Sequence, residues 1–328
     1  MSLKLSVEIE RFPIAGRFTI ARGSRTEAVV VTATLSDGTA QGRGECVPYA
    51  RYGETPEGVA AAIAAMAGAV ERGMSQQELA AAMPAGAARN ALDCALWDFD
   101  AKRAGIPAHV LAGIDRLPPV TTAYTISLGD VAEMREAAAK AAARPILKVK
   151  LGGPKGDAER IAAVREAAPD AVLIADANEG WHAGNLAENL AACAAAGVQL
   201  VEQPVKADED HILEAISHPI PICADESLHQ RSDLERLRNR YDAINIKLDK
   251  AGGLTEALAL AEEAQKLGFT MMVGCMLGTS LAMAPAFLLT PRARFVDLDG
   301  PLLLARDRDP GLVFEGSIVH APPRALWG

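Results

Sequence analysis

The chain has 328 residues, of which half are hydrophobic and 23% are charged, and its formal net charge is −9. This length accommodates a barrel of about 200–250 residues and a smaller domain, and the acidic balance gives no reason to expect nucleic acid or an anionic membrane as a partner. The five cysteines are odd in number and have no clustered spacing, which predicts a cytoplasmic protein with neither a disulfide scaffold nor a structural zinc site.

The first part of the chain has the pattern of an α+β domain. Residues 29–35 alternate in the manner of a strand and run into a hairpin turn signal at 36–39, after which another strand follows. After Pro56 the pattern becomes helical. The clearest helix is predicted over 89–105, because its apolar residues recur every three or four positions.

The later part of the chain alternates strands with helices. Strands are expected to begin near residues 120, 145, 171, 198, 220, 243, 270 and 294. This regular alternation predicts a parallel barrel rather than an open sheet, and Gly300-Pro301 replaces the last helix, so the expected fold is a TIM-like (β/α)7β barrel. The predicted divisions are an α+β capping (lid) domain at 1–115, the catalytic barrel at 116–300, and a C-terminal segment at 301–328 that returns toward the capping domain.

The stretch between Lys266 and Arg292 contains no charged residue. Its length exceeds the roughly 20 apolar residues of a membrane-spanning helix. Gly274, Gly278 and Pro285 interrupt it, however, at positions that suit a strand, a loop and the start of a helix. We therefore interpret the stretch as the buried seventh barrel strand and its helix.

One ionisable residue closes each of five successive apolar runs. Lys150, Asp176, Glu202, Asp225 and Lys247 follow one another at intervals of 26, 26, 23 and 22 residues. The carboxyl ends of barrel strands converge on one mouth, where such residues are typically catalytic. A single acidic residue at a strand end is usually a turn or cap residue, and a lone lysine is usually solvated. The order of base, three acids and base argues against that interpretation for the set.

This charge pattern suits the removal of a proton next to a carboxylate. Three carboxylates with open positions favour Mg²⁺, and no histidine at these strand ends supports zinc. Such a cation stabilises the enediolate that proton removal creates. Lys148 and Lys150 face the same side of their strand, and nearby positive charge is expected to lower the pKa of a lysine base. Lys150 and Lys247, on strands two and six, would reach the substrate from opposite faces. Two alternatives remain: the lysine pair binds a phosphate, or one lysine forms a Schiff base with a carbonyl substrate.

These residues resemble the enolase superfamily, specifically its muconate-lactonising subgroup, over essentially the whole chain. The matching segments are Lys-Val-Lys (148–150), Asp-Ala-Asn (176–178), Glu-Gln-Pro (202–204), Ala-Asp-Glu-Ser (224–227), Asn-Ile-Lys-Leu-Asp (245–249) and the lid helix at 91–98. The resemblance implies one Mg²⁺ per subunit, acid/base lysines on both sides of it, and a further lysine that holds the substrate carboxylate. The implied ligands are Asp176, Glu202 and Asp225, the acid/base lysines are Lys150 and Lys247, and the carboxylate-binding lysine is Lys148.

Several reactions share these residues within the subgroup. Asp297 and Asp299 lie on one face of the last strand and suit a substrate ammonium, and dipeptide epimerases carry a similar Asp-x-Asp. A strand-end turn before Gly300-Pro301 is the alternative explanation. The chain also lacks, at 274–280, the acidic residue that many subgroup members carry after strand seven, which makes a cycloisomerase less attractive.

Two lid segments, 19–27 and 44–54, resemble those of dipeptide epimerases that act on Ala-Glu in cell-wall peptide recycling. Arg22 and Arg25 are candidates to pair with a substrate side-chain carboxylate, and the choice between them stays open. Thr125 and Cys275 match positions that line the dipeptide in relatives, or else belong to the core.

The sequence thus predicts an isomerase that epimerises the C-terminal residue of a dipeptide, with L-Ala-D/L-Glu favoured, by two-lysine proton transfer. The alternatives are an N-acylamino-acid racemase, an o-succinylbenzoate synthase, a muconate cycloisomerase or a catalytically silent binding module. The predicted partner is the dipeptide, with no nucleic acid and no membrane. Members of the superfamily often form homo-oligomers, and no residue of this chain argues for a particular assembly.

Overall fold

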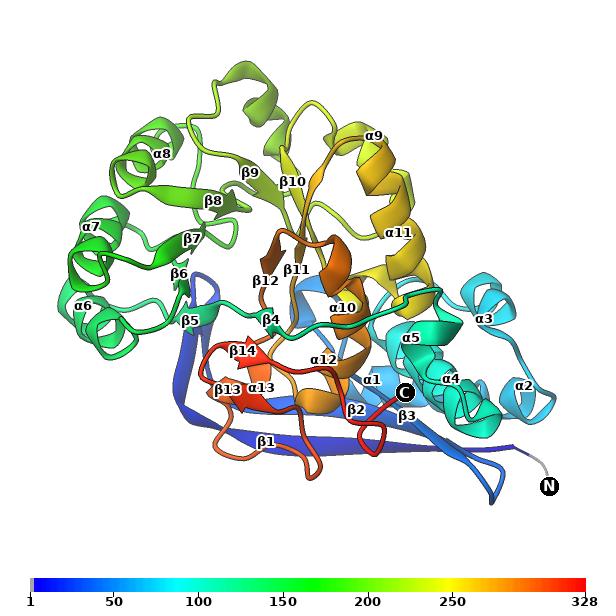
Figure 1. Cartoon of the computed structure of the whole chain (residues 1–328). Coiled ribbons are helices and arrows are strands. Elements are labelled where there is room, and N and C mark those ends of the chain that lie inside the picture. The colour runs from blue at the N-terminus through cyan, green and yellow to red at the C-terminus, as the bar shows by residue number, and fades with distance from the viewer. Residues whose placement is uncertain (1–2) are drawn as a thin grey trace.

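A three-stranded antiparallel sheet lies across one side of a curled parallel sheet in the structure, a computed structural model that describes residues 3–328 (Figure 1). The antiparallel strands are β1 (Lys4–Ile20), β2 (Gly23–Ser36) and β3 (Gln41–Cys46), hydrogen-bonded in that order. The predicted hairpin turn joins β2 to β3. Asp37 stabilises it by accepting hydrogen bonds of 2.8 Å from the backbone of Thr39 and of Ala40.

The helices of the capping domain cover this sheet, and the longest of them confirms the predicted helix. The elements are η1 (Ala50–Tyr52), α1 (Pro56–Ala64), α2 (Ala67–Glu71), α3 (Gln76–Ala82), α4 (Ala87–Ala104) and α5 (Ala108–Leu111). Helix α4 lies directly on β3, because Gly44 has no side chain: a Cβ there would lie 2.0 Å from the carbonyl oxygen of Ala91. Gly105, with φ of 73°, ends α4 in the left-handed conformation.

Eight parallel strands form the larger sheet and confirm the predicted barrel. In chain order they are β5 (Tyr124–Ile126), β6 (Ile146–Lys150), β7 (Val172–Asp176), β8 (Val198–Glu202), β9 (Ile222–Ala224), β10 (Ala243–Ile246), β11 (Thr270–Val273) and β12 (Phe295–Val296). Each strand pairs with the next one. The sheet curls until its ends meet, where the backbone N–H of Ala123 donates to the carbonyl of Val296 at 2.8 Å.

Helices pack around the outside of this sheet (Figure 1). They are α6 (Val131–Lys140), α7 (Asp157–Ala167), α8 (Leu186–Ala195), α11 (Leu254–Lys266) and α12 (Ser280–Ala286). The short α10 (Leu248–Ala251) follows β10 at the mouth and packs against α4. The alternation is less regular than expected after β8 and β9, where η2 (Asp210–Ala215), η3 (Arg231–Asp233) and α9 (Leu234–Leu237) replace long helices. Pro204 and Pro219 bracket the first of these short segments and leave little room for a longer helix.

The uncharged stretch forms β11, α12 and η4 (Phe287–Arg292), as interpreted from the sequence. Among the helices of residues 3–328, none is both long and apolar enough to span a bilayer.

The expected strand near residue 120 is not a barrel strand. Residues Val120–Thr121 form β4, which pairs with β14 (Ile318–Val319) in a separate antiparallel sheet with β13 (Phe314–Glu315). The first barrel strand begins four residues later, since the backbone groups of β4 are taken by the C-terminal segment. That segment continues after α13 (Gly300–Leu303) and ends against α4, where the indole N–H of Trp327 donates to the carbonyl of Cys94 at 3.0 Å.

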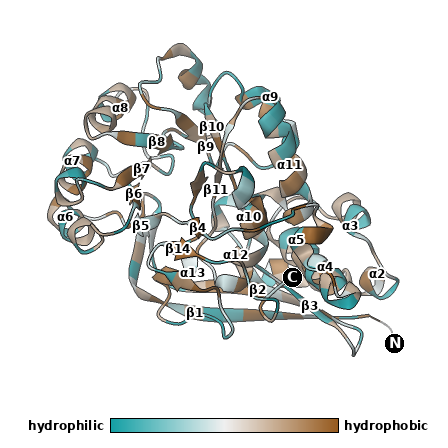
Figure 2. Cartoon of the chain, viewed as in Figure 1, coloured by the Kyte–Doolittle hydropathy of each residue, from teal (hydrophilic) through white to brown (hydrophobic). Residues whose placement is uncertain are grey.

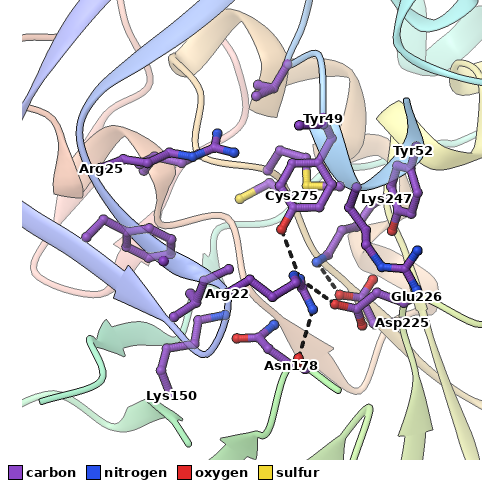
Figure 3. A pocket seen from close by; sticks show the side chains of 18 of the residues that line it. Arg22, Arg25, Tyr49, Tyr52, Lys150, Asn178, Asp225, Glu226, Lys247 and Cys275 are labelled. Carbon is purple, nitrogen blue, oxygen red and sulfur yellow. Dashed lines mark hydrogen bonds and ion pairs between the residues drawn. The ribbon is translucent and has the colours of Figure 1, made fainter. Parts of the chain in front are cut away.

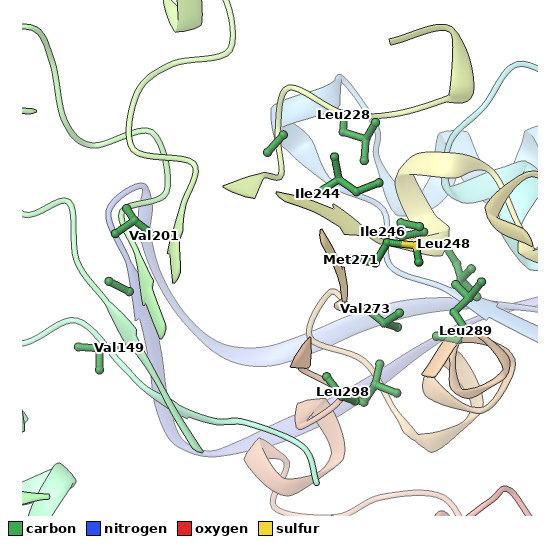
Figure 4. Packing of buried hydrophobic residues seen from close by; sticks show 14 of the residues in the cluster. Val149, Val201, Leu228, Ile244, Ile246, Leu248, Met271, Val273, Leu289 and Leu298 are labelled. Atoms are coloured by element: carbon green, nitrogen blue, oxygen red, sulfur yellow. The ribbon is translucent and has the colours of Figure 1, made fainter. Parts of the chain in front are cut away.

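Strand residues alternate between the barrel interior and the surrounding helices. Leu147 and Val149 pack outward with the large apolar cluster, part of which Figure 4 shows, while Lys148 and Lys150 face inward. Apolar strand residues recur along the buried elements, and hydrophilic residues gather on the outer helix surfaces (Figure 2). A second, smaller apolar cluster fills the barrel interior and forms the floor beneath the charged residues: Ile174, Leu200, Cys223, Ala243, Met272 and Phe295.

Candidate active site

The barrel mouth brings together the six charged residues that the strand ends were predicted to supply. In the sheet register Lys150 is opposite Asp176, and Asp176 is opposite Glu202. All six are buried, with at most 7% of each residue exposed. They are Lys148, Lys150, Asp176, Glu202, Asp225 and Lys247.

Each carboxylate directs one oxygen toward a lysine of the mouth. The three ammonium nitrogens lie 2.6 Å from Oδ2 of Asp176, Oε2 of Glu202 and Oδ2 of Asp225. The lysines concerned are Lys150, Lys148 and Lys247, respectively. Lys148 bridges three acids, because its Nζ is also 3.3 Å from Oδ2 of Asp176 and 2.7 Å from Oδ2 of Asp297.

The second oxygen of each carboxylate is held from behind. The backbone N–H of Asn178 donates to Oδ1 of Asp176 at 3.0 Å. The side-chain amide of Asn245 donates to Oε1 of Glu202 at 2.7 Å, and Nζ of Lys250 donates to Oδ1 of Asp225 at 2.5 Å. The three carboxylates therefore present one inner oxygen each to the centre of the mouth.

This donor set fits a hard divalent cation. Three buried carboxylates that each offer one oxygen suit Mg²⁺, which prefers monodentate carboxylates and open positions for water or substrate. Oε2 of Glu202 is buried and faces the ammonium group of Lys148 at 2.6 Å, and no other group of residues 3–328 donates to it. With the lysines between the acids, no three acidic, histidine or cysteine side chains of the described chain converge closely enough to enclose an ion. Binding thus requires the ammonium groups to withdraw from the inner oxygens.

The acids of the mouth dominate the electrostatics of two of its lysines. Burial lowers the pKa of Lys148, but the surrounding acids, Asp297 and Glu202 foremost, outweigh burial and raise this pKa well above its ordinary value. Lys247 behaves in the same way, because Asp225 and Glu202 outweigh its burial. Each of these two ammonium groups therefore feels the carboxylates more strongly than it feels neighbouring positive charge.

Asp297 and Asp299 lie beside this cluster, at the end of β12. Oδ2 of Asp297 is 2.7 Å from Nζ of Lys148, and its Oδ1 is buried without a hydrogen-bond partner in residues 3–328. Asp299 accepts a hydrogen bond of 2.7 Å from the backbone N–H of Thr125. Burial and the charge of Asp297 raise the pKa of Asp299 to about 7. A small cavity of about 30 Å³ is lined by both aspartates, Thr125 and Cys275.

A larger cavity of about 460 Å³ lies between the barrel mouth and the lid segments. Lys150 and Lys247 line it and lie on opposite sides in Figure 3. Arg22 and Arg25 enter from the lid, and Cys275 lines both this cavity and the smaller one. The structure therefore brings every sequence-predicted site residue to one of two adjoining cavities or to the carboxylates beneath them.

The two arginines differ in their surroundings. Arg22 is saturated by acceptors: Nη1 donates to the carbonyl of Asn178 at 2.8 Å, and Nη2 lies 2.6 Å from Oε1 of Glu226 and 2.9 Å from the hydroxyl of Tyr49. Arg25 makes no ion pair with any residue between 3 and 328, and its guanidinium lies over the ring of Tyr49 at 5.5 Å.

A clasp formed by Arg22, Arg51 and Glu179 joins both lid segments to the barrel. Glu179 accepts two hydrogen bonds of 2.9 Å from Arg51 and one of 3.2 Å from Arg22. The backbone N–H of Ala207 donates to the same carboxylate at 3.0 Å. Glu179 and Asn178 have φ of 66° and 46°, a left-handed conformation that non-glycine residues adopt at some energetic cost and that is common at functional sites.

Five residues of the site were not predicted from the sequence, and one was misplaced. Strand alternation over residues 245–249 predicts that Asp249 faces the mouth with Lys247, but β10 ends at Ile246, and Asp249 instead accepts a hydrogen bond of 2.9 Å from the lid backbone at Val47. Of the missed residues, Lys250 could have been found from the sequence, because it is a second lysine three residues after Lys247. No local pattern gives the other four a role. The missed residues are Tyr49, Arg51, Glu179, Glu226 and Lys250.

The chain is similar to characterised enzymes and solved structures along nearly its whole length. It is 49% identical to the L-Ala-D/L-Glu epimerase of Escherichia coli, over 95% of this chain and 97% of that protein. It is 44% identical to the N-acetyl-D-glutamate racemase of a Pseudoalteromonas species, over 91% and 95% of the two chains. A crystal structure of an enolase family member from Agrobacterium tumefaciens with homology to dipeptide epimerases, solved with bound sodium and L-Ala-L-Glu, has 56% identity and a TM-score of 0.98, covering 99% of this chain and 100% of that one.

The dipeptide epimerase of Cytophaga hutchinsonii, solved with Mg and D-Ala-L-Val, has 28% identity and a TM-score of 0.91, over 98% and 94% of the chains. The family model for the mandelate racemase / muconate lactonizing enzyme N-terminal domain matches residues 4–113. The model for the enolase C-terminal domain-like family matches residues 131–325. With both of its parts matched in this order, the chain belongs to the enolase superfamily, in the mandelate racemase and muconate lactonizing enzyme group.

Proposed function

We propose that the protein is a Mg²⁺-dependent dipeptide epimerase that inverts the α-carbon of the C-terminal residue of Ala-Glu. The observation that carries this proposal is the pair of lysines on opposite sides of one cavity, with three carboxylates between their strands and two further aspartates beside them. Inversion requires a proton to leave one face of the carbon and another to arrive on the opposite face. The similarity to enzymes named as epimerases supports the same reaction.

Asp176, Glu202 and Asp225 would hold the cation through their inner oxygens. Bound Mg²⁺ would supply positive charge to the substrate carboxylate and so stabilise the dianionic enediolate that removal of the α-proton creates. Its positive charge would also offset the carboxylates that raise the pKa of Lys247. A lower pKa would leave this Nζ neutral near pH 7, as a group that accepts a proton must be. One of the two lysines, Lys150 or Lys247, would remove the α-proton through its Nζ as the base. The other would deliver a proton to the opposite face as the acid.

Asp297 and Asp299 would bind the ammonium group of the N-terminal residue. The unpartnered Oδ1 of Asp297 can accept from it, and the small cavity beside both aspartates matches a small side chain such as that of alanine. Lys148 lies between Asp297 and Glu202 and can donate to the substrate carboxylate once its ammonium group leaves the inner oxygen of Glu202.

Arg25 is the better candidate for the glutamate side chain. Arg22 already pairs with Glu226 and Glu179, so its charge is compensated within the protein. The guanidinium of Arg25 lines the same cavity without an acidic partner and can pair with a carboxylate. Free, largely buried thiols at all five cysteines suit a reducing compartment, and we place the enzyme in the cytoplasm.

Proton NMR in D₂O with Mg²⁺ and either L-Ala-D-Glu or L-Ala-L-Glu tests the proposal. The glutamate α-proton signal should disappear while the other diastereomer appears, and EDTA should stop both. Lys150→Ala and Lys247→Ala should each abolish inversion, and a half-active variant of either kind would contradict the two-lysine scheme. Exchange without inversion would mean that a single lysine is competent.

An N-acetylglutamate racemase is the second candidate, because one relative of high identity bears that name. Such a substrate has no ammonium group and would gain nothing from two carboxylates at its N-terminal end. Asp297→Asn should therefore weaken turnover of Ala-Glu much more than turnover of N-acetylglutamate. Equal effects on both substrates would favour the racemase.

A further inference from the structure

The carboxylates of the barrel mouth share an arrangement that proton transfer alone does not require: each has its outer oxygen held by another group. We propose that Lys250 and Asn245 are positioning residues that make the site select Mg²⁺ over the larger Ca²⁺. By occupying the outer oxygens, they restrict Asp225 and Glu202 to one donor oxygen each. This inference rests on the proposed function, because it takes these carboxylates to be the cation ligands.

Lys250 holds Asp225 at two points. Its side chain is buried, and its Nζ donates both to Oδ1, at 2.5 Å, and to the backbone carbonyl of the same aspartate. A third donation reaches the carbonyl of Asn245 at 3.3 Å. Because one ammonium group binds the side chain and the main chain of Asp225, the carboxylate cannot turn its outer oxygen toward the mouth without losing this anchor.

Asn245 holds Glu202 in a similar way. It is fully buried in β10, and its amide donates to Oε1 at 2.7 Å, which leaves Oε2 facing the mouth. Its Oδ1 packs against the backbone of Gly274, the residue after β11, where a Cβ would lie only 2.5 Å away. The outer oxygen of Glu202 is thus held by a side chain that is itself fully buried and closely packed.

The two cations differ in what they ask of a carboxylate. Mg²⁺ demands near-octahedral geometry at about 2.0–2.1 Å, whereas Ca²⁺ takes roughly 6–8 oxygens and readily binds both oxygens of one carboxylate. A site that offers single oxygens favours the smaller ion. Release of an outer oxygen would allow bidentate binding and so would help Ca²⁺ more than Mg²⁺.

The ratio of the two dissociation constants isolates this geometric effect. Removing the positive charge of Lys250 strengthens the attraction of the site for any divalent cation. Because this gain applies to Mg²⁺ and Ca²⁺ alike, it cancels to first order in the ratio of their dissociation constants. Isothermal titration calorimetry of Mg²⁺ alone and of Ca²⁺ alone should give the ratio for the native chain, for Lys250→Met and for Asn245→Leu. Groups that orient metal ligands typically change affinity by about 10–100-fold, so we expect the Ca²⁺-to-Mg²⁺ ratio of dissociation constants to fall by about tenfold in each variant.

Ser227→Ala is the matched control. Ser227 is buried two residues from Asp225, and its hydroxyl donates to Asp210 at 2.7 Å without touching the three carboxylates. Its ratio should stay at the native value. An unchanged ratio in Lys250→Met and Asn245→Leu would overturn the inference, as would an equal change in the control. If Lys250→Met does not fold, Asn245→Leu decides alone.

The native titration separates this inference from the proposed function. If the native chain does not bind one Mg²⁺ per subunit, the proposed function fails together with the inference. If it binds Mg²⁺ and the variants keep its selectivity, only the inference fails.

Discussion

Neutralising Glu179 should open the lid while leaving the barrel intact. Its side chain is 5% exposed and accepts from Arg22 and Arg51, whose side chains are 26% and 40% exposed. A hydrogen bond to a charged group contributes about 1.5–3 kcal/mol, and the half-exposed Arg51 lies at the low end because solvent screens it. Glu179→Gln keeps an acceptor but removes the charge, so we expect the closed lid to lose about 1.4–3 kcal/mol, a rise of roughly 10–100-fold in the open population.

Hydrogen–deuterium exchange is the direct assay. Backbone amides at 20–25 and 49–53, which lie within the two lid segments, should exchange faster in Glu179→Gln, while those of the barrel strands keep their protection. The KM for Ala-Glu should rise, because part of the binding energy is then spent on closing the lid. The free energy of unfolding should fall by no more than the same ~1.4–3 kcal/mol, because the core of the barrel is unchanged.

Glu214→Gln is the control for removal of an arginine-paired carboxylate. Glu214 pairs with Arg240 at 2.7 Å and is 45% exposed, away from the cavity residues. It should leave lid exchange and KM unchanged. Equal exchange at the lid in Glu179→Gln and in the native chain would refute the clasp, and so would a general loss of protection throughout the barrel.

Three further predictions concern packing within the capping domain and against it. Burial raises the pKa of Asp249 to about 7, so the native state holds a proton that the unfolded chain releases, and this stabilisation is lost as the pH rises from about 4 to 7. The unfolding free energy of Asp249→Asn relative to the native chain should therefore increase over that range by up to roughly 4 kcal/mol, and a pH-independent difference would contradict the shift. Trp327→Phe loses the bond to Cys94 and should lower stability by about 1–3 kcal/mol in denaturant titrations; no loss would mean that the C-terminal segment is not anchored there. Gly44→Ala places a methyl group against the carbonyl of Ala91 and should destabilise by about 3 kcal/mol or more, and a native melting temperature would show that α4 can shift away.

The parts of the site that could be predicted are those governed by a local period. Asp176, Glu202 and Asp225 each end a buried strand, and the alternation of side chains turns each toward the interior, one layer above an apolar floor residue two positions earlier. Parallel pairing then places them side by side without any information from distant segments. Strand spacing likewise predicted the barrel, and it failed at 120–121, where pairing with the C-terminal segment replaced pairing with a neighbouring barrel strand.

The residues that were missed depend on contacts between segments far apart in the chain. Glu179 meets Arg51, 128 positions earlier, and Asp249 meets Val47, 202 positions earlier. Each of these contacts pairs a loop of the capping domain with a loop of the barrel, and loops carry no repeating pattern that would fix a side-chain direction. The same reasoning explains why Arg22 and Arg25 could not be separated by sequence. Both are lid arginines, and the positions of Glu179 and Glu226 in the folded chain distinguish the compensated guanidinium from the one that can meet a substrate.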